Sequence, residues 1–164
     1  MIRYARIETA VGTLLATAVN GRLTGLYFEG KPHAPRRGAD WQEDSHAQPF
    51  AECARQVHEY LAGKRDTFDL PLAPSGTDFQ ERVWREIAKI PFGERITYAE
   101  LARRAGAPGS ARAAGAATGR NPISIVVPCH RVVGTSGALT GYAGGIERKA
   151  RLLSHEARRA AIAA

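Results

Sequence analysis

Cysteine is scarce in this sequence, and its scarcity excludes several classes of protein. The only cysteines among the 164 residues are Cys53 and Cys129, which lie far apart along the chain. Thiols so widely separated form neither the disulfide framework of a small secreted domain nor the paired spacing of a zinc site. We therefore expect no bound metal, and a reducing, cytoplasmic compartment is the simplest setting for the free thiols.

Long hydrophobic runs are also missing. No stretch approaches the ~20 apolar residues that cross a bilayer, and the N-terminal Met1–Arg6 lacks the apolar core of a secretory signal. The sequence therefore predicts no membrane partner. The hydrophobic fraction of 44% is normal for a globular protein, and the length allows one domain of ordinary size or two small ones.

Negative charge is scarce in the second part of the chain. Residues 1–76 contain nine Lys/Arg and nine Asp/Glu, whereas residues 77–164 contain fourteen against seven, so all of the net +7 lies there. Such an excess is the electrostatic footprint of a polyanion partner, most often nucleic acid. An arginine-rich composition with solvated charges and no partner would leave the same numbers, so this alternative stays open.

The first part, residues 1–76, carries no pattern that indicates chemistry and resembles an antiparallel sheet followed by a helix. The predicted strands are Arg3–Glu8, Thr13–Val19 and Arg22–Phe28, followed by a polar loop over 31–48. A helix is predicted over Phe50–Ala62, a further strand over Thr67–Leu70 and a linker over 71–76. Asn20-Gly21 is the strongest short-range hairpin signal. Cys53 and Val57 follow helical spacing, so we expect Cys53 in the core.

The second part, residues 77–164, predicts a mostly helical domain. Thr77 and Gln80 have the spacing of a capping box, and Thr97 with Glu100 repeats it. The predicted helices run from Thr77 to Pro91 and over Tyr98–Ala105, Ala111–Thr118 and Ile146–Glu156, and the tail 157–164 is expected to fray. The middle pair of helices, joined by a glycine-containing turn, matches a helix-turn-helix.

The second helix of this helix-turn-helix is unusually slim. Between Ala111 and Ala117 only Arg112 projects, since every other residue is alanine or glycine. The minor groove of DNA is only ~6 Å wide against ~12 Å for the major groove. A slim helix suits that narrow space, and Arg112 could enter the base stack. The alternative, an alanine-rich helix packed inside the protein with Arg112 reaching out, stays open.

Cys129 follows an apolar run, Ile123–Val127, that reads as a buried strand. Pro128 cannot donate to a sheet ladder, so the strand should stop or turn there. This places a thiol and the imidazole of His130 at the exposed end of a rigid element, which suits a reactive cysteine. The alternative is that Cys129 is an inert, buried hydrophobe, as most free cysteines are.

A glycine-rich loop, Gly141–Gly145, precedes the last helix. It lacks the full phosphate-binding spacing, and we interpret it as backbone that approaches a flat ligand, with Tyr142 as one wall. If the last helix packs beside Cys129, Glu156 is the carboxylate best placed to orient His130; otherwise it is a surface charge.

The segment Pro128-Cys129-His130-Arg131-Val132 resembles the signature of the O6-alkylguanine-DNA alkyltransferases, the methylated-DNA–protein-cysteine methyltransferases. The resemblance covers residues 77–158 through Phe79-Gln80, Val83-Trp84, Phe92-Gly93, Tyr98, Ala111-Arg112-Ala113, Asn121-Pro122, Gly137, Tyr142, Gly144-Gly145 and Glu156. It implies an α/β (α+β) fold. A ribonuclease-H-like domain would span 1–76, and a helical domain with the helix-turn-helix and the cysteine-bearing strand or turn would span 77–164.

The resemblance implies direct-reversal DNA repair of the bacterial single-function type. The alkyl group of O6-alkylguanine, and of O4-alkylthymine in some members, would pass irreversibly to Cys129 after the base flips out of double-stranded DNA. The protein would approach from the minor groove, act once without a cofactor, and work as a monomer that could cluster on DNA.

The resemblance also implies roles for single residues. Cys129 would be the acceptor, His130 its base through a bridging water, and Glu156 the group that orients His130. Tyr98 would press on the 3′ phosphate and donate toward guanine N3, and Asn121 would brace the turn. Contacts to DNA would come from Arg112, Tyr98, Ala111, Ala113, Ala114 and Gly115. The base pocket would be formed by Pro128, Val132, Tyr142, Ala143 and Gly144.

The sequence departs from the family at two points. Some members carry a serine that donates to guanine O6 where this chain has Ala143, so backbone N–H groups would replace that donor. Some members bind zinc in the first domain through Cys and His. Because Cys53 is the only cysteine there, we expect no zinc.

Three other functions fit the residues less well. A non-catalytic sensor of alkylated bases lacks the reactive cysteine, which is present here. A Cys-His-Glu hydrolase would not need the basic second part. A helix-turn-helix regulator needs polar side chains that read base edges, and the alanines between Ala111 and Ala117 provide none.

Overall fold

The structure is a computed structural model that describes residues 1–163. The chain divides into two compact units, the first formed by Met1–Ser75 with Pro122–Val126, the second by residues 76–121 and those from 127 onward. Within residues 1–163, no helix is both long and apolar enough to cross a membrane.

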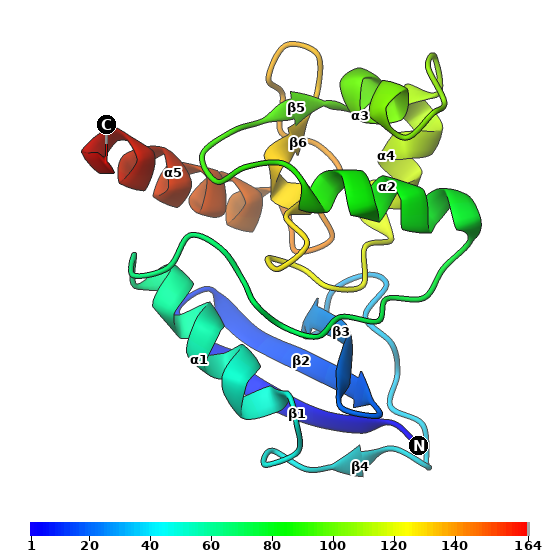
Figure 1. Ribbon diagram of the computed structural model, residues 1–164, viewed down its shortest axis with the longest axis vertical. Helices are drawn as coiled ribbons and strands as arrows, with labels where there is room; N and C mark the ends of the chain where they lie inside the picture. The colour runs from blue at the N-terminus through cyan, green and yellow to red at the C-terminus, as the bar shows by residue number, and fades with distance from the viewer. Residues whose placement is uncertain (164) are drawn as a thin grey trace. The chain divides into compact units, whose positions relative to one another are not determined.

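The first unit is a small sheet with one helix against it (Figure 1). The first three strands are antiparallel, β4 runs parallel to β1, and the order is β3-β2-β1-β4. The elements are β1 (Arg3–Thr9), β2 (Gly12–Val19), β3 (Arg22–Phe28), β4 (Gln42–Glu43) and α1 (Phe50–Leu61). Asn20 and Gly21 both have positive φ, at 51° and 75°, as the predicted hairpin requires.

The predicted strand Thr67–Leu70 is wrong, and β4 lies inside the region predicted as a loop. At Asp69 the backbone of this segment pairs with a side chain. Gln56 of α1 donates to the Asp69 carbonyl at 2.9 Å and accepts from the Asp69 N–H at 2.8 Å. The only sheet pairing nearby is a single bridge from Leu72 to Leu23.

The predicted strand over Ile123–Val127 is also wrong. Ile123 forms one bridge to Leu26 of β3, and the chain then turns, with Ile125 at φ 70°. Both isoleucines are nevertheless at most 1% exposed. The apolar run therefore indicates burial and not strand formation. A residue with left-handed backbone, such as Ile125, ends the hydrogen-bond ladder of a strand whatever its side chain.

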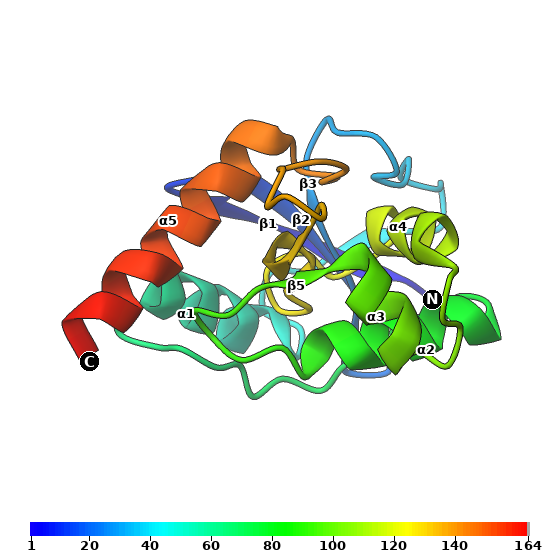
Figure 2. The ribbon, with the colours of Figure 1, turned by 90° about the horizontal axis from the view of Figure 1, so that it is seen from above.

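The second unit is mainly helical, as predicted. Its elements are α2 (Asp78–Ala88), β5 (Ile96–Thr97), α3 (Tyr98–Arg104), α4 (Ala111–Gly119), the short 3-10 turn η1 (Cys129–Arg131), β6 (Val132–Val133) and α5 (Ile146–Ala163). The helices α2, α3 and α4 pack together, and β5 pairs in parallel with β6 (Figures 1 and 2).

Local capping signals determine where these helices begin. The capping box of Thr77 and Gln80 is complete, and the Thr97 hydroxyl accepts from the Glu100 N–H at 3.1 Å. The expected fraying of the tail is wrong for residues 157–163, which continue α5. Alanine and arginine, which dominate that stretch, are strong helix formers. Residue 164 lies outside the described residues.

Candidate active site

Cys129 lies in the turn η1 and not at the end of a strand. Its side chain is only 3% exposed. Asn121 donates to the Val127 carbonyl at 2.9 Å and also hydrogen-bonds the thiol, so it braces the turn from both sides. Burial raises the pKa of Cys129 to about 11, against the opposing effects of Asn121 and the Lys149 charge. The resting cysteine is therefore a thiol that needs a base.

His130 is fully buried, and its Nε2 lies 2.7 Å from Glu156 Oε2. Burial lowers the pKa of His130, while the Glu156 carboxylate opposes this shift. Burial alone would raise the pKa of Glu156, but hydrogen bonds from His130 and Arg131 hold it below its ordinary value. A neutral imidazole beside a carboxylate carries its proton on Nε2. His130 Nδ1 is then an acceptor, and it is buried with no hydrogen-bond partner among the described residues.

Arg131 completes this network, and the sequence interpretation missed its role. Its Nε and one terminal nitrogen bind the two oxygens of Glu156 at 2.8 and 2.9 Å, and the other donates to the Ile90 carbonyl at 2.6 Å. The Gly93 N–H adds a weaker contact to Glu156 at 3.3 Å. Arg131 stands in the signature segment, but nothing in the sequence says that its side chain turns inward to α5.

A second cluster of hydrogen bonds joins α3, the loop before α5, and α5 itself. The Tyr98 hydroxyl donates to the Thr140 carbonyl at 2.8 Å. Lys149 Nζ donates to the same carbonyl at 2.8 Å and to the Tyr98 hydroxyl oxygen at 3.3 Å. Lys149 is fully buried, and burial lowers its pKa to about 8. Sequence reasoning missed Lys149, for which the helical pattern around Ile146 and Leu153 offered no signal.

A cleft of about 390 Å³ opens between the helix-turn-helix and the loop before α5. Its lining includes Tyr98, Ala111, Arg112, Gly115, Thr140 and Gly141. Arg112 is exposed and has no ion pair among residues 1–163. Gly115 faces Tyr98, since a Cβ at this position would lie 3.6 Å from the tyrosine Cδ1.

The slim helix α4 has one exposed face and one face packed inside the protein, so it combines features of both interpretations left open by the sequence. Arg112 and Ala113 are exposed, whereas Ala114 is fully buried with Ala117 on the inner face. The Trp84 indole of α2 donates to the Ala117 carbonyl at 2.8 Å. The helical period turns the Ala114 side chain inward, and the contact of Ala114 with DNA stays a prediction.

The predicted pocket residues come from two segments, one around η1 and one in the loop before α5. Pro128, Val132, Tyr142 and Gly144 are buried, and Ala143 is half-buried. The Tyr142 ring meets the His130 ring edge-on, with centroids 6.5 Å apart. Val132 follows η1, where its N–H donates to the Cys129 carbonyl, and it pairs with Ile96. The Gly144 carbonyl accepts from Arg148 at 3.0 Å.

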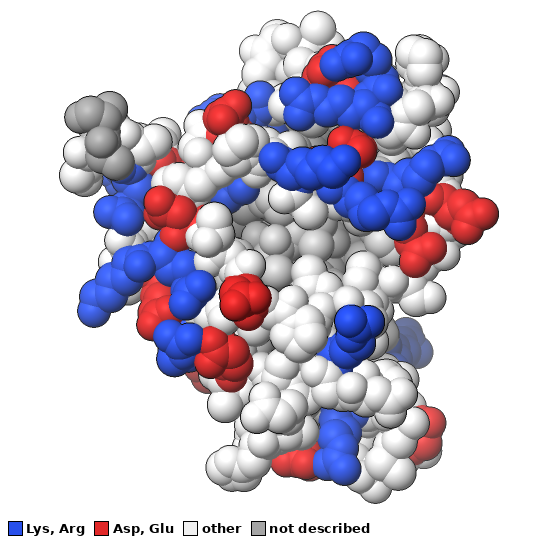
Figure 3. Space-filling model, viewed as in Figure 1, with Lys and Arg blue, Asp and Glu red and all other residues white. Residues whose placement is uncertain are grey.

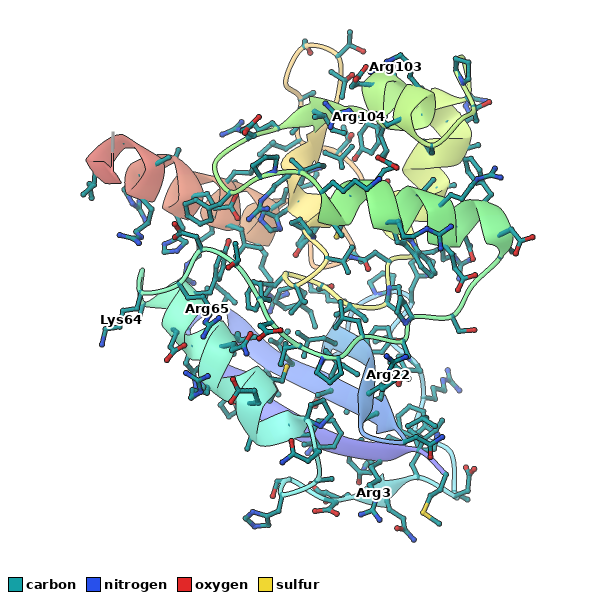
Figure 4. All side chains as sticks on the ribbon, viewed as in Figure 1. Arg3, Arg22, Lys64, Arg65, Arg103 and Arg104 are labelled. Carbon is teal, nitrogen blue, oxygen red and sulfur yellow. The ribbon has the colours of Figure 1, made fainter. Side chains whose placement is uncertain are left out.

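Basic side chains gather over the second unit, where α2 and α3 lie in Figure 3. Arg103 and Arg104, labelled on α3 in Figure 4, are not free, because both pair with Glu100. Nowhere in residues 1–163 do three or more His, Cys, Asp or Glu side chains gather as metal ligands would. Cys53 is fully buried in α1, and burial raises its pKa to about 12.

Two family models match the chain almost from end to end. The model described as "6-O-methylguanine DNA methyltransferase, DNA binding domain" matches residues 78–158, and that of the ribonuclease-like domain matches residues 2–74. The chain belongs to the 6-O-methylguanine DNA methyltransferase family. Membership makes it a DNA-binding enzyme of direct-reversal repair, which transfers a methyl group from DNA to a protein cysteine. The regulator and hydrolase interpretations are set aside.

Individual members of the methyltransferase family are similar over nearly their whole length. A methylated-DNA–protein-cysteine methyltransferase of Mycolicibacterium paratuberculosis is 46% identical over 158 residues, which cover 96% of this chain and 94% of the relative. The constitutive enzyme of Bacillus subtilis is 42% identical, covering 93% and 94%.

Solved structures confirm the predicted fold class. The Mycobacterium tuberculosis O6-methylguanine methyltransferase superposes with a TM-score of 0.88 at 43% identity, covering 97% of this chain and 94% of that one. The methyltransferase of the same organism in complex with DNA gives a TM-score of 0.89 at 44% identity, covering 96% and 94%.

Proposed function

We propose that this methyltransferase repairs O6-alkylguanine in double-stranded DNA by passing the alkyl group irreversibly to Sγ of Cys129. The observation that carries the proposal is the buried series formed by Cys129, His130 and Glu156. Cys129 is directly followed in η1 by His130, and the Glu156 carboxylate holds this imidazole at 2.7 Å. This is the arrangement of nucleophile, base and orienting group that activates a nucleophile.

The first step is removal of the thiol proton. With a pKa of about 11, Cys129 is almost entirely protonated at neutral pH. The S–H bond breaks, and the proton passes through a bridging water to His130 Nδ1, the unpaired acceptor. Glu156 accepts the Nε2–H and stabilises the imidazolium that results.

The second step moves the alkyl group. The thiolate attacks the alkyl carbon, the S–C bond forms, and the electrons of the C–O6 bond remain on guanine, which takes up a proton. Tyr98 would donate toward guanine N3, for which its hydroxyl exchanges the 2.8 Å bond to Thr140. The product is a thioether that no nearby group hydrolyses, so each molecule acts once.

DNA would be bound from the minor groove by the exposed face of α4. Flipping a base costs a few kcal/mol, less for a damaged, weakly paired base. Arg112 stands exposed at the cleft and would fill the vacated space, while Ala111, Ala113 and Gly115 allow a close approach. Tyr142, beside His130, would form a wall of the base pocket with Pro128, Val132, Ala143 and Gly144.

In this proposal residues 1–76 are a domain without catalytic duties, and residues 77–164 bind DNA and accept the alkyl group. The compact units support a division near this position, since the first runs to Ser75 and the second begins at Gly76, while Pro122–Val126 of the second domain belong to the first unit. No cofactor is needed, because the thiol itself is the acceptor. The protein would work in the cytoplasm as a monomer that can cluster on DNA, and O4-alkylthymine would be a second substrate.

The decisive experiment is intact-protein mass spectrometry after mixing with a duplex that contains one O6-methylguanine. The expected result is a stoichiometric gain of one methyl group, ~14 Da, mapped to Cys129 and absent in Cys129→Ala. No gain with tight lesion binding would instead indicate a damage sensor. The absence of both a mass gain and lesion binding would overturn the proposal.

A further inference from the structure

Trp84 of α2 holds the C-terminal end of the helix α4. Its side chain is buried, and its indole N–H donates to the Ala117 carbonyl at 2.8 Å. The last four carbonyls of a helix have no partner within the helix, and Ala117 is the third residue from the end of α4. The Arg120 N–H also donates to this carbonyl, at 3.2 Å. The indole supplies the shorter of these two bonds, and it comes from another helix.

The opposite edge of the Trp84 ring is fixed by Gly76, where the linker ends. A Cβ at Gly76 would lie 2.5 Å from Cη2 and 2.9 Å from Cζ3 of the indole, and 2.6 Å from Oε1 of Gln80. That Oε1 accepts from the Thr77 N–H at 3.0 Å in the capping box of α2. A side chain at Gly76 would therefore displace the ring or the cap. The indole is held at its benzene edge by the linker and at its N–H by α4.

The slim helix α4 depends on such a bond for its position. Its buried residues are Ala114, Ala117 and Thr118, so its inner face buries little apolar area. The hydrophobic effect is non-directional and scales with that area, and it leaves the rotation and axial position of so small a face weakly determined. A hydrogen bond to the Ala117 carbonyl is directional. The Trp84 indole can therefore fix where α4 ends.

The end of α4 leads directly to the turn that carries the thiol. Asn121 lies two residues beyond α4, and its N–H donates to the Thr118 carbonyl at 3.1 Å. The Asn121 side chain donates to the Val127 carbonyl at 2.9 Å. The Cys129 N–H donates to the same Val127 carbonyl at 2.8 Å. Asn121 and Cys129 thus share one acceptor, and a shift at the end of α4 is passed to η1.

We infer that Trp84 is a positioning residue for the alkyl transfer: its indole fixes the end of α4, and Asn121 passes that position to Cys129. The inference rests on the proposed function, in which Asn121 braces the turn and Cys129 accepts the alkyl group. Trp84 is only 4% exposed. It therefore acts through Asn121 and not by contact with DNA.

A double-mutant cycle in the full chain separates this role from a general loss of stability. Trp84→Phe removes the N–H and keeps an aromatic ring, Asn121→Ala removes the brace, and a third variant combines them. Two rates are followed by mass spectrometry well below the Tm of every variant. They are methyl transfer from saturating methylated duplex and alkylation of Cys129 by iodoacetamide without DNA. Trp41→Phe, the same change at the other tryptophan, is the matched control, and Cys129→Ala supplies the background from Cys53.

Trp84→Phe is expected to slow both rates by about tenfold, within the roughly 10²-fold that a 1 Å misplacement can cost. In the Asn121→Ala background the same change causes no further loss, because the position of α4 is no longer passed on. Gly76→Ala displaces the ring but leaves its N–H, and slows both rates by a smaller factor. Trp41→Phe keeps the wild-type rates.

The inference is overturned if folded Trp84→Phe keeps both wild-type rates, or if the losses from Trp84→Phe and Asn121→Ala multiply in the combined variant. It is also overturned if Trp84→Phe weakens only the Kd for duplex DNA, since Trp84 would then fix the DNA-binding face alone. Should a variant fail to fold, Asn121→Ser replaces Asn121→Ala and Gly76→Ala replaces Trp84→Phe. The iodoacetamide rates need no DNA, so they test Trp84 even if no methyl group maps to Cys129.

Discussion

Replacing Glu156 with glutamine should lower both the stability of the protein and the rate of methyl transfer. Glu156 is 1% exposed and holds Arg131 at 2.8 and 2.9 Å and His130 at 2.7 Å. The Glu156→Gln variant keeps the shape of the side chain but removes the charge. Arg131 is then a buried guanidinium without a counter-charge, and the imidazolium of His130 loses its stabilising carboxylate.

The magnitude follows from the burial of the pair. Removing one partner of a buried ion pair costs about 3–5 kcal/mol, and each kcal/mol lowers Tm by roughly 2–4 °C for a chain of this size. Methyl transfer should fall by at least about 10²-fold, the lower range of what a positioned general base contributes. Both losses are expected in the single variant, so this variant alone does not distinguish them.

The matched variant is Arg131→Met combined with Glu156→Gln, which removes both charges together. Replacing a complete buried ion pair by neutral groups of similar volume is often neutral or stabilising. We therefore expect the double variant to recover much of the lost Tm while methyl transfer stays low. Thermal unfolding and single-turnover transfer from a methylated duplex measure the two quantities. A double variant as unstable as Glu156→Gln, or one that regains activity, would refute this reasoning.

The remaining predictions concern the thiol, DNA binding and pH. Cys129→Ala should abolish transfer yet keep duplex binding, measured by mass spectrometry and fluorescence anisotropy; residual transfer would mean another acceptor. Arg112→Ala should slow repair of duplex DNA more than reaction with free O6-benzylguanine. Arg120→Ala removes an exposed arginine at the opposite, C-terminal end of α4, outside the cleft, and should slow neither reaction. Equal losses on both substrates would contradict the proposal that Arg112 fills the space left by the flipped base. The logarithm of DNA affinity should fall with the logarithm of the salt concentration, with a slope of ~0.9 per phosphate contacted. An affinity that does not change with salt would contradict DNA binding by the basic residues 77–164. The pKa values of His130 and Glu156 are both lowered in the folded protein from the ordinary values of 6.5 and 4.5, so the unfolded chain binds more protons below these pH values. The free energy of unfolding should therefore be highest above pH 6.5 and decline as the pH falls. Urea midpoints that stay constant down to pH 4.5 would contradict this prediction.

Elements with local signals were predicted well from the sequence. The hairpin at Asn20-Gly21 depends on two residues that tolerate positive φ, and the start of α2 depends on Thr77 and Gln80 within one turn. The signature segment likewise indicated Cys129 with its neighbours. Each of these signals lies within a few residues of its effect.

Elements that depend on distant partners were predicted poorly. The run Ile123–Val127 has the composition of a strand, yet it bridges β3 at one residue and then turns. Composition reports burial, but strand formation also requires a continuous neighbouring edge. In the same way, the inward face of α4 was decided by its packing in the second unit, which turned Ala114 away from solvent.

The sequence by itself determined the class of chemistry, since the thiol, the imidazole and the basic excess are all visible in it. Only the tertiary structure decided how the charges are shared. It closed Arg131 on Glu156, left His130 Nδ1 without a partner, and buried Lys149 against Thr140 and Tyr98. These groups come from α3, η1 and α5, and no local pattern encodes their meeting, because it results from helix packing. Burial then sets their protonation, since desolvation acts only on groups that the fold has removed from water.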